Sequence, residues 1–212
     1  PPVDGYAVQF SDTHACSTSY IVYQLLEALA GTDAIDQAMA ESLYVGIMTD
    51  TGNFSFSSLT SDLFRAVAVL IDKGVNVPYV NSSVYNNFSE GRMRLVGNML
   101  NDKMVTDYEF GVAYVSLTEE EMRRFDFIQG DSEGFVNYPL SIRGIRMSAM
   151  FIQTKHSIRV SLRSRGEVDV NVFARRYFDG GGHRNAAGGK SYVPMNETLE
   201  NFRKYLREYF GA

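Results

Sequence analysis

Basic and apolar side chains alternate in the segment "SIRVSLRSR" at residues 157–165. In a strand, this period of two would place Arg159, Arg163 and Arg165 on one face and the aliphatic side chains on the other. A planar guanidinium group matches the geometry of phosphate, so this spacing predicts an anion-binding site. An edge strand that uses its charges to resist aggregation is the competing interpretation.

Five glycines surround His183 and Arg184 in the segment "FDGGGHRNAAGG" at residues 178–189. Such a run indicates a tight turn, a close crossing of two backbones or a loop wrapped around a ligand. In the last case the backbone N–H groups of the loop would form an anion-binding nest, and His183 and Arg184 would add charge-assisted donors. A turn without a ligand is an equal alternative, but the preceding arginine-lined segment favours a phosphate site.

A single carboxylate, Asp50, ends the apolar part of the segment "GIMTDTGNF" at residues 46–54. A carboxylate in this position could bind a hard metal ion such as Mg²⁺ or Mn²⁺. A helix or strand end capped by aspartate is the more common arrangement, and one carboxylate cannot hold two metal ions. His14 and His156 are isolated histidines, which we expect on the surface rather than at a metal.

The overall composition limits the class of protein. The chain has 212 residues, of which 45% are hydrophobic, and a net charge of −5, which argues against a general nucleic-acid coat protein. Residues 143–190 nevertheless contain ten Lys and Arg but three Asp and Glu, which predicts an anionic ligand held at one place. The single cysteine suits a reducing, cytoplasmic compartment, and no apolar run is long enough to span a membrane.

These candidate residues need elements that position them. Helical spacing of apolar residues, with capping and stop residues, predicts helices over 17–31, 34–48 and 60–74, with one strand-like stretch in the first third of the chain. A long linker helix is expected from Pro78 to about Asp102. The natural interpretation is two α/β units joined by a helix.

The pattern of apolar residues in the second half predicts strands that alternate with helices. Its predicted elements are hairpins over 104–117 and 145–166, a helix at 118–125 with a Thr118–Glu121 capping box, a helix at 169–178, a short strand at 191–193 and a closing helix from about 196 to 210. The expected domains are residues 1–77, a linker over 78–104, and residues 105–212.

Three segments resemble a known family. The segment "VSLRSRGEVDVNVFARRYFDGGGHRNAAGG", with its pair Arg163 and Ser164, resembles the signature of the DHH-associated domain, type one, of DHH-superfamily phosphoesterases. The segment "GIMTDTGNF" resembles the fourth motif of their catalytic domain, and "ACSTSYIVYQLL" resembles the helix that follows the Asp-His-His motif. The most similar subgroup is the RecJ-like bifunctional oligoribonuclease and pAp phosphatase type.

The resemblance implies a two-metal hydrolysis. Two Mn²⁺ ions, with Mg²⁺ as the alternative, would activate a water that attacks a phosphate of short RNA, pAp or a dinucleotide. Asp50 would be a metal ligand. The substrate-binding residues would be His183, Arg184, Arg163, Ser164, Arg159, Gly181 and Gly182, with the two glycines allowing close approach. The implied fold is a truncated parallel-sheet domain, a linker helix and a smaller α/β DHH-associated domain.

The chain departs from the family pattern at its first residues. The first three motifs, including Asp-His-His, are absent, and in relatives that motif directly precedes a segment like "PPVDGY". We therefore expect a fragment that lacks most metal ligands, hydrolyses little or nothing, and exposes apolar faces that a homodimer or a partner would cover. A non-catalytic nucleotide- or RNA-binding module and a structural interaction domain are the alternatives.

Overall fold

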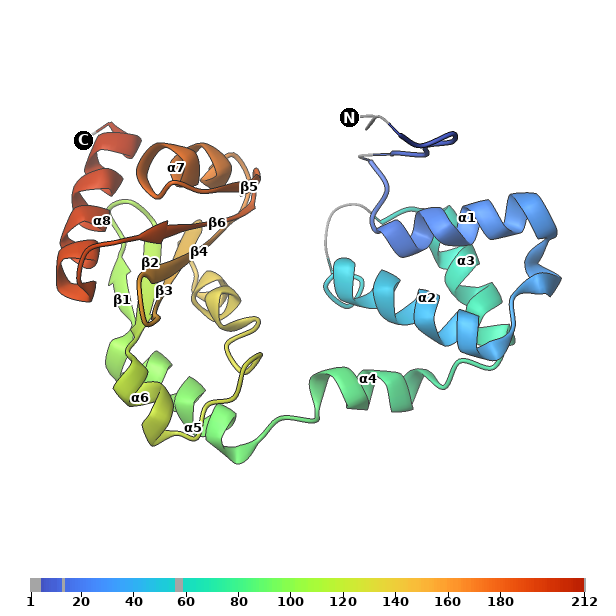
Figure 1. Ribbon diagram of the computed structural model, residues 1–212, viewed down its shortest axis with the longest axis horizontal. Helices are drawn as coiled ribbons and strands as arrows, with labels where there is room; N and C mark the ends of the chain where they lie inside the picture. Colours follow the sequence, from blue (N-terminus) through green and yellow to red (C-terminus); the bar gives the residue numbers. More distant parts are fainter. Residues whose placement is uncertain (1–4, 13, 56–58, 212) are drawn as a thin grey trace. The chain divides into compact units, whose positions relative to one another are not determined.

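The computed structural model describes residues 5–12, 14–55 and 59–211. The chain divides into two compact units, with the boundary between Asn87 and Phe88 (Figure 1). Each unit has its own hydrophobic core. Among the described residues, no helix is both long and apolar enough to cross a membrane.

The first unit is helical throughout its described residues. Its elements are α1 (Thr18–Ala30), the 3-10 helix η1 (Thr32–Ala34), α2 (Gln37–Asp50), α3 (Ser61–Asp72) and α4 (Val77–Tyr85). Each α-helix begins with a side chain that accepts a hydrogen bond from a backbone N–H of the first turn, as Thr60 does for α3. The three predicted helices are therefore confirmed.

The strand-like stretch expected in the first third of the chain is not seen in the described residues. The apolar segment before Asp50 continues α2, because Ala40, Leu43, Tyr44 and Ile47 recur at helical spacing and all are buried in one core. Apolar side chains are nonetheless exposed on this unit, as expected. They include Val22, Leu25 and Leu29 on α1 and Phe64 and Ile71 on α3.

The long helix expected over residues 78–102 is wrong. The structure has α4, then α5 (Glu90–Asn98), which runs directly into one π-helical turn, η2 (Met99–Lys103). Between α4 and α5 the side chain of Ser89 accepts a hydrogen bond from the Arg92 backbone N–H and so starts a new helix. The break coincides with the boundary between the two units.

The second unit is built on a six-stranded sheet with the order β1-β2-β3-β4-β6-β5. The strands are β1 (Val105–Asp107), β2 (Val112–Leu117), β3 (Met147–Gln153), β4 (Ile158–Ser164), β5 (Gly181–His183) and β6 (Ala186–Ser191). Only the β2–β3 pair is parallel. The crossover between these two strands contains α6 (Glu119–Arg124) and the 3-10 helix η3 (Phe135–Ser141).

Helices cover the two faces of this sheet differently. On one face, α7 (Val170–Tyr177) and α8 (Met195–Phe210) bury an aromatic core around Phe151, Phe173 and Phe202 (Figure 1). On the other face, α5, η2, α6 and η3 pack over β2 and β3. The mixed α/β class, both predicted hairpins, the capping box of Thr118 and Glu121, and the helices over 169–178 and 196–210 are confirmed.

The strand expected over residues 191–193 is misplaced. The last strand, β6, covers residues 186–191 and pairs with β5, so the glycine-rich segment forms a hairpin instead of a loop. Small side chains let these backbones approach closely, which offsets the low strand propensity of glycine.

Candidate phosphate-binding site

Strand register brings two predicted site residues into one row. Arg163 on β4 pairs with Ala186 on β6, and Ala186 pairs with His183 on β5. Directly paired residues point to the same face, so the Arg163 and His183 side chains flank the Ala186 methyl group. Two strand spacings separate their backbones by about 10 Å, a gap that two long side chains can bridge through one phosphate.

A second basic row lies further along the same strands. Arg159 pairs with Lys190, and both side chains are exposed. Between the two rows Ser161 pairs with Gly188, which pairs with Gly181. We call Arg159, Arg163, Lys190 and His183 the basic sheet face. Its middle row has almost no side chains, so the backbone between the four basic groups is accessible to a ligand.

Three of the glycines are required by the packing of the hairpin itself. A Cβ at Gly180 would lie 2.0 Å from the Gly188 carbonyl oxygen, and one at Gly182 would lie 2.5 Å from that of Ala186. A Cβ at Gly189 would lie 2.5 Å from the Phe178 carbonyl oxygen. The close backbone crossing therefore explains these positions, whereas a Cβ at Gly181 would meet only ordinary contacts, the shortest at 3.6 Å.

Hydrogen bonds fix the tip of the hairpin to the loop after β4. The Asn185 side-chain amide donates to the Ser164 hydroxyl (2.9 Å) and lies within bonding distance of the Gly166 and Val168 carbonyls (3.3 and 3.4 Å). The backbone N–H of Ser164 donates to the Asn185 carbonyl (3.1 Å). Because the same tip joins β5 to β6, this network holds His183 in a constant position relative to Arg163.

Arg163 is a half-buried cation without a carboxylate partner among the described residues. Its Nη1 donates to the Leu162 carbonyl (2.9 Å), and none of the ion pairs among the described residues includes it. Burial lowers the pKa of the guanidinium below its ordinary value, although an arginine stays protonated at neutral pH. A desolvated cation of this kind gains most from an anionic ligand.

Other predicted residues lie elsewhere. Arg184 forms an ion pair with Glu167 (2.5 Å) in which both side chains are exposed, away from the row formed by Arg163 and His183. Ser164 is buried, and its hydroxyl donates to the Val168 carbonyl (2.7 Å), so it supports the hairpin from within. The outward amide of Gly182 donates to Asn171 Oδ1 (2.9 Å), so this N–H is already occupied.

The role of Asp50 as a metal ligand stays a prediction. Asp50 is exposed at the last turn of α2, and the described ranges contain no group of three or more His, Cys, Asp or Glu side chains that could hold a metal ion. Two Mn²⁺ ions need several such ligands at once. The residues described here therefore do not fit a dinuclear centre.

The sequence patterns missed Lys190 and Asn185. Lys190 enters the site only through the β4–β6 register, which a strand over 191–193 could not show. Asn185 follows His183 by two residues and fits the two-residue hairpin turn that it helps to close.

Comparison with known proteins places the second unit in a domain family. Residues 108–212 match the model of the DHHA1 domain. The "Bifunctional oligoribonuclease and PAP phosphatase NrnA" of Bacillus subtilis is 32% identical over 183 residues, which cover 85% of this chain and 56% of that protein. The "Cyclic-di-AMP phosphodiesterase GdpP" of the same organism is 28% identical over 95% of this chain and 30% of its own length.

A solved structure extends the similarity to both units. The crystal structure of an exopolyphosphatase-related protein from Bacteroides fragilis superposes with a TM-score of 0.95 and 38% identity, over 99% of this chain and 61% of that chain. The chain thus spans little more than half the length of NrnA and of the Bacteroides fragilis protein. It spans about a third of the length of GdpP. The matched domain and the similar sequences show that the chain belongs to the DHH family, with residues 108–212 as its DHHA1 domain.

Proposed function

We propose that this chain binds a phosphate of a short oligoribonucleotide, pAp or a dinucleotide on its basic sheet face, as the substrate-binding part of a nucleotide phosphoesterase. Membership of the DHH superfamily supports the phosphoesterase assignment. The names of the similar Bacillus subtilis proteins, which denote activity on RNA, PAP and cyclic di-AMP, support a nucleotide substrate.

The observation that carries the proposal is the row formed by Arg163, Ala186 and His183. It places a half-buried cation and an imidazole on one face, beside strands without bulky side chains. A phosphate lying there would receive charge-assisted hydrogen bonds from both groups, and the backbone would not hold it at a distance. Arg159 and Lys190 would attract the rest of an anionic ligand.

Replacing Arg163 or His183 with alanine is expected to weaken the binding of pAp by roughly tenfold to a hundredfold. Each variant loses a hydrogen bond to the charged phosphate, which contributes about 1.5–3 kcal/mol. Titration calorimetry on the 212-residue chain measures the affinity, and Arg207→Ala, an exposed arginine on α8, is the matched control. Unchanged affinity in both site variants would refute the proposed site.

Hydrolysis by the 212-residue polypeptide with added Mn²⁺ is expected to stay at the buffer background. The physical reason is that Asp50 has no companion ligands among the described residues. Release of mononucleotides from a short oligoribonucleotide, followed by chromatography, measures this. Turnover at ordinary enzymatic rates of about 1–1,000 per second would contradict it.

A non-catalytic nucleotide- or RNA-binding module is the second candidate. It is favoured because the described residues contain no group of three or more side chains that could hold a metal ion. Asp50 separates the two. In a longer polypeptide that hydrolyses RNA, Asp50→Asn should abolish turnover and leave binding intact, whereas a binding module has no turnover to lose.

A further inference from the structure

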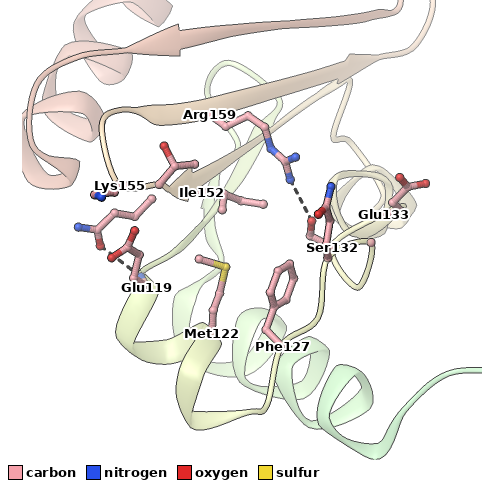
Figure 2. A pocket seen from close by; sticks show the side chains of 12 residues that line it. Glu119, Met122, Phe127, Ser132, Glu133, Ile152, Lys155 and Arg159 are labelled. Carbon is pink, nitrogen blue, oxygen red and sulfur yellow. Dashed lines mark hydrogen bonds between the residues drawn. The ribbon is translucent and has the colours of Figure 1, made fainter.

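A cavity of about 460 Å³ opens in the second unit, between α6, the loop over residues 127–133 and the β3–β4 hairpin (Figure 2). A smaller cavity of about 240 Å³ adjoins it and shares the lining residues Glu119, Met122 and Phe127. The larger volume is in the range of small-molecule sites in proteins. Arg159 of the basic sheet face lines it, but the proposed phosphate site does not account for its other lining residues.

The floor of the cavity is apolar and includes an aromatic ring. Figure 2 shows Met122, Phe127 and Ile152 grouped below the Arg159 guanidinium. Ile152 is buried in the core that covers this face, and Met122 and Phe127 pack against the same core. A flat apolar ring could therefore stack on Phe127 without displacing charged groups.

Polar groups form the wall around that floor. The Arg159 guanidinium donates to the Ser132 hydroxyl (3.0 Å), and Gln153 Oε1 accepts from the Glu119 backbone N–H (3.3 Å). Gln129 also lines the cavity. Side-chain amides and a hydroxyl can recognise the edge of a heterocyclic base, because they offer both donors and acceptors.

The charges disfavour a phosphate inside the cavity. Two carboxylates, Glu119 and Glu133, line it together with two cations, Lys155 and Arg159. The balance is neutral, unlike that of the basic sheet face. An uncharged ring suits this lining better than a dianion does.

The wall is held in place from behind. Arg92 on α5 is buried, and its guanidinium donates to the Asp131 carbonyl and to the Glu133 carbonyl (2.9 Å). The Asp131 carboxylate accepts from the Ile128 backbone N–H (3.0 Å). A loop fixed at three points loses little conformational entropy when a ligand binds, so the cavity is preorganised.

Arg159 connects the cavity to the basic sheet face. It lies on the same side of β4 as Arg163, four residues away, which corresponds to about 13 Å along a strand. A single phosphate cannot reach both places. A ligand with a phosphate at Arg163 and a ring in the cavity must carry at least one nucleoside beyond that phosphate.

We propose that this cavity is a nucleobase pocket, in which the base of a nucleotide attached to the phosphate at Arg163 and His183 stacks on Phe127. The proposal rests on the proposed phosphate site. It makes the substrate a nucleotide whose base the protein recognises, and it assigns Phe127 as a specificity-determining residue.

The test compares two probes on the 212-residue chain by titration calorimetry. One is AMP, and the other is ribose 5-phosphate, an abasic probe that carries the same phosphate and sugar without the base. Stacking on an aromatic side chain predicts roughly tenfold to a hundredfold tighter binding of AMP. Phe127→Ala should remove this difference and leave the affinity for the abasic probe unchanged.

Two further variants keep the outcomes separate. Phe127→Leu keeps an apolar side chain and should retain the fold, as circular dichroism would show, while losing most of the base-dependent affinity. Tyr108→Ala, an exposed aromatic residue outside the cavity, should change neither affinity. Equal binding of both probes to the unmodified chain, or the full difference kept in Phe127→Leu, would overturn the nucleobase pocket.

The Arg163→Ala variant distinguishes this failure from that of the proposed function. If the pocket alone is wrong, Arg163→Ala still weakens both probes. If Arg163→Ala and His183→Ala leave the affinities for both probes unchanged, the phosphate site is wrong, and the nucleobase pocket that depends on it is wrong as well.

Discussion

Replacing Arg92 with alanine is expected to lower the free energy of unfolding of the second unit by about 3 kcal/mol. The guanidinium is buried, lies 4.1 Å from the Phe88 ring centroid and 4.8 Å from that of Phe135, and donates to two backbone carbonyls. Its removal leaves buried acceptors without a donor at about 1–3 kcal/mol each and also ends both cation–π contacts.

Urea unfolding followed by circular dichroism measures the loss, and hydrogen exchange locates it. Exchange should accelerate most over residues 128–134, the loop that Arg92 holds. Arg94→Ala is the control on the same helix, since Arg94 forms only an exposed ion pair with Glu90 and should change stability by less than about 0.5 kcal/mol. Arg92→Lys keeps the charge but cannot span both carbonyls, so it should lose a large part of the same stability. A loss equal to that of Arg94→Ala would contradict this role.

Replacing Gly180 with alanine is expected to separate β5 from β6 and to abolish detectable binding of pAp. The added Cβ would lie 2.0 Å from the Gly188 carbonyl oxygen and 2.6 Å from the Gly189 Cα. Both are backbone atoms, so only a shift of the whole strand relieves the overlap. His183 lies at the end of that strand and would move away from Arg163.

Gly181→Ala is the matched control one residue away. Its Cβ would make ordinary contacts with Asn171 and Arg175, so the fold and the melting temperature should stay close to those of the unmodified chain. Because that Cβ points toward α7, the affinity for pAp should also stay close to that of the unmodified chain. Equal affinities and equal melting temperatures for Gly180→Ala and the unmodified chain would refute the packing argument.

Local signals in the sequence predicted most elements correctly. Thr60 and Thr118 start helices through side-chain hydrogen bonds that involve only nearby residues, and such bonds are visible in the sequence. The alternation around Val160 predicted β4 in the same way. The break at Ser89 was missed because a helix that restarts after four residues has almost the same apolar spacing as one that continues.

The site was only partly predictable because it depends on pairing between distant strands. The residues Arg159, Arg163 and His183 could be chosen by type and spacing, but their common face follows from the register of β4, β6 and β5. The cavity was not predictable at all. Its lining residues come from a helix, a loop and a hairpin that the parallel β2–β3 crossover brings together, and none of them forms a recognisable motif.

The alternation of β4 has a consequence for how this protein can diverge. Val160 and Leu162 face the core, whereas Arg159, Ser161 and Arg163 face the proposed ligand, and the two sets never share a position. Mutations in the second set can therefore change the proposed ligand contacts at a lower cost in stability than mutations of the buried first set. A descendant could acquire a new specificity through a few substitutions on one strand, while its ancestral scaffold stays intact.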